Sequence, residues 1–178
     1  MNIFVVDDCP VLAAVALPDK HIVKMPLECC QMISVIYSSW YHDWGTIPKK
    51  DGTPYNTTKG AFRNHPCTQW AAASYENLAW LIRHGHALCN EYGYRFGKLH
   101  SCREALWTAE DIFTFKSKNT IAVYKNVKSF VRAMPDELKY DDTIDTITAY
   151  RRYVASKPWV KDNYVRLPKR KPEWVSNT

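Results

Sequence analysis

Apolar and polar positions alternate at helical spacing from residue 19 to residue 36. The apolar positions follow one another at steps of three and four, at Ile22, Met25, Cys29, Met32 and Ile36. This spacing is typical of a helix face that packs against a core. Polar side chains repeat the pattern one step behind, at His21, Lys24, Glu28 and Gln31. The sequence therefore predicts a helix over residues 19–42, and Pro26 inside it predicts a kink beside Glu28.

Two interpretations of this polar row are open. A titratable base, a cation and a carboxylate on one rigid helix face are the groups that acid–base chemistry uses. The alternative is a solvated face on which Lys24 and Glu28 form a surface ion pair, which contributes only about 0.3 kcal/mol. The row alone favours the solvated face, so a catalytic interpretation needs support from elsewhere in the chain.

The remaining pattern predicts a mostly α, single-domain compact helical fold with a long loop. An extended opening at residues 3–6 precedes a brief helix over 11–17, with Asp8 as its cap and Pro10 in its first turn. Turn-forming pairs fill the loop at 43–66. Helices are then predicted from His65-Pro66-Cys67 to Gly93 or Gly97, with a restart at Ser74. Further helices are predicted at 102–107, 125–133 and 141–155, and a short strand or turn at 121–124.

Composition restricts the classes of protein that the chain can represent. The 178 residues are 46% hydrophobic and 13% aromatic, which is typical of a folded globule. The sequence contains no apolar run of about eighteen residues and opens without a basic leader, so we expect a cytoplasmic protein. The adjacent Cys29 and Cys30 suit reduced thiols. No Cys-x-x-Cys or His-Glu-x-x-His spacing is present, so we expect neither a metal nor a cofactor.

Positive charge is concentrated at the C-terminal end. Residues 151–178 contain eight basic and two acidic side chains, which equals the net charge of +6 for the whole chain. Aromatic residues alternate with these cations, at Tyr153, Trp159, Tyr164 and Trp174. Cations that neutralise phosphates and rings that stack on bases indicate a nucleic-acid surface. A compatible alternative is a proline-punctuated tail, over 156–178, that wraps a domain formed by residues 1–155 and anchors its aromatics in grooves.

Several motifs resemble one enzyme family. Leu17-Pro18-Asp19-Lys20-His21, followed seven residues later by Glu28, resembles the leading segment of the pyrimidine-dimer DNA glycosylases, the endonuclease V family of T-even bacteriophages. The segments 65–70 and 91–96 resemble its histidine-containing loop and the helix that follows. Lys157-Pro158-Trp159 and Pro172-Glu173-Trp174 are similar to its closing Pro-x-Trp motif. The chain also resembles a group of uncharacterised phage proteins with an Asp-Lys-His-x-x-Lys-Met motif.

The resemblance implies a compact helical fold and chemistry on a flipped nucleotide of damaged double-stranded DNA. In the family, the amine of the processed N-terminal residue attacks the sugar C1′, and a glutamate positions it. Carried over, this makes Glu28 the catalytic carboxylate and His21 its neighbour, while Arg63 and His65 hold phosphate or base. The DNA-binding residues implied by the resemblance and by the charge pattern are Lys20, Arg63, His65, Lys157, Trp159, Lys169, Arg170, Lys171 and Trp174.

The beginning of the chain departs from the family pattern. Asn2 is too large for efficient removal of the preceding methionine, so we expect Met1 to persist. Ile3 and Phe4 occupy the place of the family's basic residue. The amine then comes from Met1, Lys20 or Lys24, or the lyase step is missing. Asp7 and Asp8 either cap the first helix or orient the amine.

Three functions remain open at this point. The first is a DNA glycosylase that excises a damaged or modified pyrimidine, with or without AP-lyase activity. The second is a non-catalytic nucleic-acid-binding or host-interaction phage protein on the same scaffold. The third is an enzyme that acts on free nucleosides, for which the basic tail would be dispensable.

Overall fold

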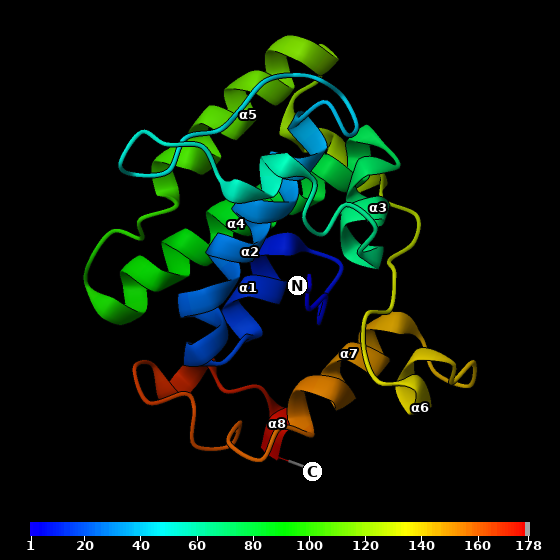
Figure 1. The fold of residues 1–178 in the computed structure, drawn as a ribbon. Coiled ribbons are helices and arrows are strands. Elements are labelled where there is room, and N and C mark those ends of the chain that lie inside the picture. The colour runs from blue at the N-terminus through cyan, green and yellow to red at the C-terminus, as the bar shows by residue number, and fades with distance from the viewer. Residues whose placement is uncertain (177–178) are drawn as a thin grey trace.

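Two long helices, α2 (Asp19–Tyr37) and α4 (Tyr75–Phe96), pack against each other and organise the fold. The computed structural model describes residues 1–176 and is mostly helical, as predicted. Two neighbours of α4 are α1 (Pro10–Ala16) and α5 (Arg103–Ser117), while α3 (Pro66–Ala72) contacts both long helices (Figure 1). The shorter elements are η1 (Asn56–Lys59), η2 (Ile121–Asn126), α6 (Asp136–Lys139), α7 (Thr146–Ala155), η3 (Pro168–Arg170) and α8 (Glu173–Ser176).

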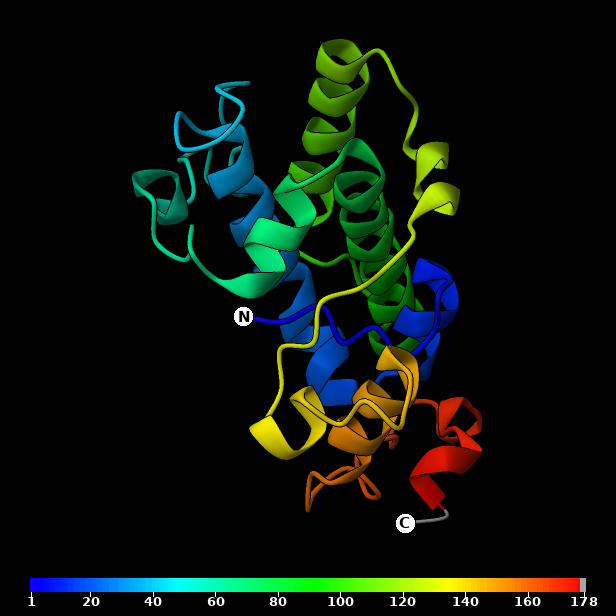
Figure 2. The same cartoon turned by 90° about the vertical axis from the view of Figure 1, so that its right-hand side faces the viewer.

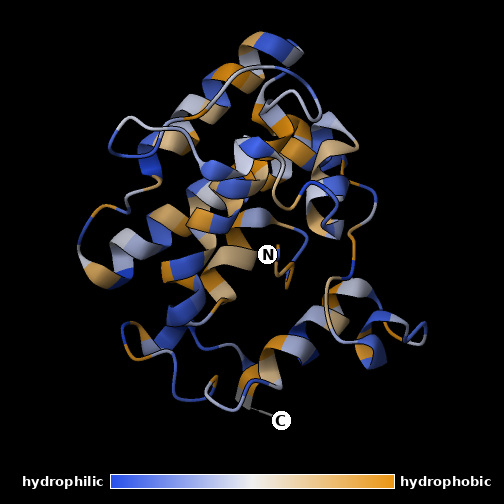
Figure 3. Ribbon diagram, in the orientation of Figure 1, coloured by the Kyte–Doolittle hydropathy of each residue, from blue (hydrophilic) through white to orange (hydrophobic). Residues whose placement is uncertain are grey.

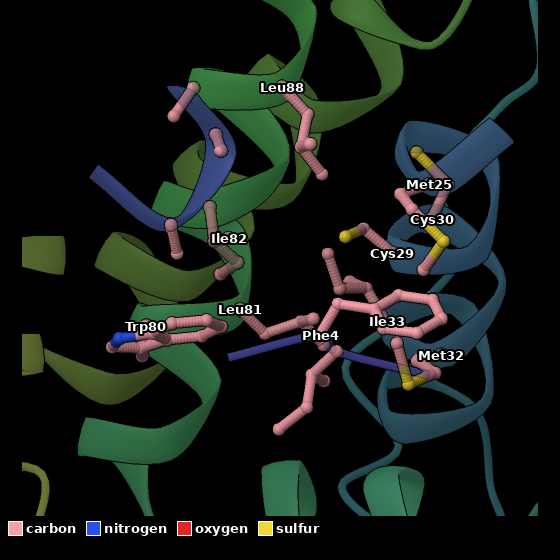
Figure 4. Packing of buried hydrophobic residues seen from close by; sticks show 14 of the residues in the cluster. Phe4, Met25, Cys29, Cys30, Met32, Ile33, Trp80, Leu81, Ile82 and Leu88 are labelled. Carbon is pink, nitrogen blue, oxygen red and sulfur yellow. The ribbon is translucent and has the colours of Figure 1, made fainter. Parts of the chain in front are cut away.

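The core lies between the apolar faces of α2 and α4. The predicted stripe on α2 is confirmed, because all five of its side chains are almost completely buried. Leu81 and Leu88 of α4 point toward this stripe, and Phe4 from the N-terminal segment lies between the two helices (Figure 4). Both long helices carry hydrophobic and hydrophilic residues side by side, as amphipathic helices do (Figure 3). All six cysteines are free thiols.

Local capping signals set both ends of α4. The side chain of Ser74 accepts a hydrogen bond from the backbone N–H of Asn77, as the predicted restart requires. The helix ends at Gly97, whose φ of +68° is the left-handed conformation that glycine adopts most readily. The α1 prediction needs one correction: Cys9, not Asp8, is the N-cap.

The α2 helix ends at Tyr37, five residues earlier than predicted. The hydroxyl of Ser38 donates to the carbonyl of Val35, and the backbone N–H groups of Trp44 and Gly45 return to the carbonyl of Tyr37. The chain therefore folds back and satisfies the last carbonyl groups of the helix, which a continuing helix would otherwise have bonded.

The predicted helix at 125–133 is wrong beyond the end of η2, where residues 127–133 are non-helical. Side chains from elsewhere bind this backbone: Trp70 Nε1 donates to the carbonyl of Ser129, and the hydroxyl of Tyr150 donates to that of Val131. The guanidinium of Arg132 donates to the carbonyls of Leu138, Asp141 and Ile144, so that it holds the next loop.

The helix predicted at 141–155 begins at Thr146 rather than 141. The helix predicted at 102–107 is longer than expected and extends to Ser117.

The C-terminal segment lies against one end of the helical body (Figures 1 and 2). Val160, Tyr164 and Val175 are buried in the common core, and the Tyr164 hydroxyl donates to the carbonyl of Ala16. Asn163 accepts hydrogen bonds from the first two backbone N–H groups of α2, whose N-cap, Pro18, has no capping side chain. Residues 177–178 of the predicted tail lie outside the described residues.

A buried charge network fastens this segment to α2 and α4. The Arg95 guanidinium donates to Glu91 and Asp19 and to the carbonyls of Leu17 and Val15. Arg170 of the tail donates to both oxygens of Glu91. The Glu91–Arg95 pair is therefore more than the ordinary helix contact that its four-residue spacing suggests, because it joins three distant segments.

None of the described helices combines the length and apolar character needed to cross a membrane.

Candidate active site

Three members of the polar row of α2, His21, Lys24 and Glu28, face a cleft between the N-terminal segment and the turn that follows α7. Its volume is about 410 Å³. The side chains that line it come from both ends of the chain and from α2: Met1, Asn2, Phe4, Lys20, His21, Lys24, Met25, Glu28, Tyr153, Lys157 and Trp159. Met1 and Trp159, which lie near opposite ends of the sequence, thus share one cavity.

Glu28 is the carboxylate of this cleft. Its side chain is only 8% exposed, and its two oxygens have different cationic neighbours. Lys24 Nζ lies 3.1 Å from Oε1, and the amine of Met1 lies 3.7 Å from Oε2. The solvated-face interpretation of the row therefore holds for Lys24, which is 70% exposed, but not for Glu28 or His21, which are buried.

The N-terminal segment is held rigidly above Glu28. The side-chain oxygen of Asn2 accepts hydrogen bonds from the backbone N–H groups of Ile3 and Phe4, and its amide nitrogen donates to the carbonyl of Ala133. The side chain of Met1 is only 1% exposed, but Met1 as a whole residue is partly exposed. The exposed part of Met1 is therefore its backbone, which carries the amine. Phe4 adopts a φ of +39°, a strained conformation of the kind that is concentrated at functional sites.

Aromatic rings line the same cleft as the carboxylate. The Phe4 ring stacks on His21 with centroids 4.2 Å apart, and on Tyr153 at 5.9 Å. Trp159 meets His21 edge-on at 5.6 Å. Lys20 Nζ lies 4.5 Å above the Trp159 ring and Lys157 Nζ 3.9 Å above that of Tyr153. The cleft thus offers ring surfaces for a base and ammonium groups for phosphates.

His21 is neutral at physiological pH. Burial, reinforced by the nearby charges of Lys157 and Lys24, lowers its pKa to about 4. Its Nδ1 atom is buried and has no hydrogen-bond partner among residues 1–176. A neutral imidazole with one unpartnered nitrogen can exchange a hydrogen bond with a molecule that enters the cleft.

Seven of the predicted site residues line the cleft: Met1, Lys20, His21, Lys24, Glu28, Lys157 and Trp159. His65 lies near it, because the charges of the N-terminal ammonium and of Glu28 both act on its pKa, which burial lowers. Its Nδ1 accepts a hydrogen bond from the backbone N–H of Cys67 and so caps α3.

The other predicted DNA-binding residues lie outside the cleft lining. Arg63 stacks on Trp40, and Arg170 is bound to Glu91. Lys169 is exposed, Lys171 lines a separate groove on the tail, and Trp174 packs on the core. Asp7 accepts a hydrogen bond from the backbone of Cys9 and lies 3.8 Å from Arg151, and neither it nor Asp8 lines the cleft.

Sequence reasoning missed the site roles of Asn2 and Phe4, and it placed Tyr153 on a C-terminal nucleic-acid surface without predicting its contact with Phe4 in the cleft. An asparagine that bonds the backbone two residues ahead is a recognised turn signal, so Asn2 was detectable in principle. The position of Tyr153 depends on how α7 docks, for which the sequence contains no local signal. Within residues 1–176, no group of three or more His, Cys, Asp or Glu side chains is arranged to hold a metal ion.

This arrangement supplies an amine, a carboxylate beside it and an aromatic, cationic surround, which together suit attack on a sugar carbon of a nucleic acid. The family model for pyrimidine dimer DNA glycosylase matches residues 1–103, which is more than half of the chain. Comparisons with curated proteins and with solved structures find no match. By this match, which includes the amine, His21 and Glu28, the chain belongs to the pyrimidine dimer DNA glycosylase family.

Proposed function

We propose that this protein excises a damaged or modified pyrimidine from duplex DNA and that the amine of Met1 is its nucleophile. The observation that carries the proposal is the 3.7 Å approach of the Met1 amine to the buried carboxylate of Glu28 inside a cleft. A nucleophilic amine needs a neighbour that orients it and balances the charge that develops during attack. Glu28 is placed to do both.

The proposed reaction begins with extrusion of the damaged nucleotide into the cleft. The amine nitrogen of Met1 attacks the sugar C1′, and the bond from C1′ to the base breaks, so that the base leaves with the electron pair. Positive charge develops on the sugar in the transition state, and the carboxylate of Glu28 stabilises it. A proton then passes from the nitrogen to O4′ as the C1′–O4′ bond breaks, and the nitrogen lone pair forms a double bond to C1′, which opens the sugar ring and gives a protonated imine between Met1 and the DNA.

The imine makes a lyase step accessible. Removal of a proton from C2′ allows the C3′–oxygen bond to break, which cleaves the strand by β-elimination. His21 and Glu28 are the buried titratable groups of the cleft, and the neutral imidazole of His21 can accept that proton. We therefore propose AP-lyase activity together with base excision.

Met1 is a better candidate for the nucleophile than the two lysines. Lys24 is bound to Oε1 of Glu28 and points toward solvent, and Lys20 lies over the Trp159 ring. The Met1 amine instead lies against the second carboxylate oxygen, at the end of a segment fixed by Asn2. We assign the two lysines and Lys157 to phosphate binding at the rim of the cleft.

Borohydride trapping tests the proposal directly. The protein is incubated with duplex DNA containing an abasic site, and borohydride reduces any imine to a stable amine. We expect a covalent protein–DNA adduct whose cross-linked peptide begins at Met1, and strand cleavage at the thymine dimers of irradiated duplex DNA. Lys24→Ala and Lys20→Ala variants should still form the adduct, while chemical acetylation of the N-terminal amine should prevent it.

The rival functions give different results in the same experiment. Salt-sensitive binding without adduct or base release would support a non-catalytic DNA-binding or host-interaction protein. Turnover of free nucleosides without DNA would support a nucleoside-modifying enzyme. An adduct that maps to Lys20 or Lys24 would retain the lyase proposal but refute the role of Met1. The intact mass of the protein shows at the outset whether Met1 is retained.

A further inference from the structure

Phe62 combines two unfavourable features in one turn. Its φ is +64°, in the left-handed region that disfavours residues with a side chain. Its side chain is also half exposed, at 50%, so the ring gains little from burial. Strain and exposure at a single aromatic residue both lower the stability of the fold, and backbone strain of this kind is concentrated at functional sites.

The turn that presents Phe62 is rigidly supported. A Cβ atom at Gly60 would lie 2.5 Å from the Trp40 indole, so only glycine permits this close approach. The Arg63 guanidinium stacks on the same indole at 4.3 Å and donates to the carbonyl of Gly60. The Tyr41 hydroxyl donates to the carbonyl of Arg63. The strained conformation of Phe62 is thus fixed by contacts on both sides.

This turn lies next to the Glu28 cleft. His65 follows Phe62 by three residues. The charges of the N-terminal ammonium and of Glu28 both act on the pKa of His65, so His65 lies near both groups. In Figure 2 the segment between η1 and α3 lies on the same side of the molecule as the N-terminus. A duplex whose nucleotide enters the cleft would therefore extend past this turn.

We propose that Phe62 inserts into the DNA duplex beside the lesion and fills the space that the extruded nucleotide leaves. This inference rests on the proposed function, because it assumes that a nucleotide is extruded into the cleft. Extrusion costs stacking and pairing energy, and an inserted apolar ring replaces part of the lost stacking. The exposed Lys59 and the guanidinium of Arg63 flank the ring with positive charge, which complements the phosphates on either side of an insertion point.

Phe62→Gly is the informative variant. Glycine removes the ring and also relieves the positive φ, so the variant should be at least as stable as the parent protein. Phe115→Ala is a matched control, because Phe115 is also an exposed phenylalanine, at 69%, with a positive charge nearby, the Lys118 ammonium at 4.5 Å, and it lies near the C-terminal end of α5. Thermal unfolding of both variants checks that they are folded.

The experiment uses a duplex that contains a thymine dimer and, in the flanking base pair, the fluorescent base 2-aminopurine. Stacking on a neighbouring nucleobase quenches its emission, so the emission rises when a phenyl ring takes the place of that base. We expect the parent protein and Phe115→Ala to raise the emission at saturation to the same level. Phe62→Gly should give less than about a third of that rise and bind the duplex roughly tenfold more weakly, because one base–aromatic contact is lost. Equal emission from Phe62→Gly and the parent would overturn the insertion proposal.

The same samples separate this proposal from the proposed glycosylase activity. If the parent protein does not cleave the strand at the dimer, yet raises the emission while Phe62→Gly does not, insertion stands and the excision proposal fails. If it cleaves the strand at the dimer with no rise in emission, or with a rise that Phe62→Gly retains, excision stands and insertion fails. A parent protein that does not bind the duplex overturns both.

Discussion

Replacement of Glu28 by glutamine tests the centre of the proposed mechanism. Glutamine keeps the shape of the side chain and removes its negative charge. In the structure this charge lies 3.7 Å from the Met1 amine and 3.1 Å from Lys24, and the side chain is largely shielded from water. The substitution therefore removes the electrostatic partner of the nucleophile while it leaves the cleft filled.

The expected loss of rate follows from Coulomb's law. A unit positive charge at the position of the amine, at an effective dielectric constant of about 20, interacts with the carboxylate by about 4 kcal/mol. If the cationic sugar of the transition state forms at a similar distance, Glu28→Gln loses stabilisation of that order. This corresponds to a decrease of roughly a thousandfold in the rate of excision.

Single-turnover kinetics measure this loss without interference from product release. Excess protein is mixed with a duplex that contains a thymine dimer, and breakage of the glycosidic bond is followed in time as strand cleavage after alkali treatment. Binding is measured separately by fluorescence anisotropy, and we expect the affinity of Glu28→Gln to stay within about threefold of the parent, because the carboxylate does not attract phosphate. Glu104→Gln is the control, since the Glu104 side chain on α5 is 81% exposed.

Two outcomes would refute this reasoning. A Glu28→Gln rate within tenfold of the parent would remove the carboxylate from the chemical step. An equal loss in Glu104→Gln would show that the decrease reflects overall charge rather than the local interaction. Unfolding curves for both variants establish that any loss occurs in folded protein.

Three further predictions concern stability and the tail. Arg95→Met leaves the buried Asp19 carboxylate without its cation and should lower the free energy of unfolding by about 3–5 kcal/mol in urea titrations; a loss below about 1 kcal/mol would contradict a structural role for the network. His21 and His84 each have a pKa lowered by burial to about 4, so the unfolded chain binds their protons first as the pH falls. The free energy of unfolding should thus be highest above about pH 6.5 and should fall by about 3 kcal/mol per histidine as the pH is lowered toward about 4. A free energy of unfolding that does not change over this range would refute the burial of neutral histidines. Finally, the double replacement of Lys169 and Lys171 by alanine should reduce the slope of log affinity against log salt by about 2, and an unchanged slope would assign these lysines no phosphate contact.

The sequence by itself determined the elements whose signals are local. The apolar stripe and polar row of α2 followed from spacing, the start of α4 from Ser74, and its end from Gly97. These signals suffice because a helix face or a cap involves residues a few positions apart. The same row also contained His21, Lys24 and Glu28 as the candidate chemistry, although not their exposure.

Only the tertiary structure decided which of these side chains meet and which are shielded from water. Glu28 is buried because the N-terminal segment covers it, and the cleft is completed by Tyr153 of α7 and by Trp159 from the turn that follows. Residues 127–133 lost their predicted helix because distant side chains, including Trp70 and Tyr150, bind that backbone instead. Each of these outcomes depends on contacts between segments far apart in the chain, whose energies are set by packing and burial rather than by the spacing of neighbouring residues.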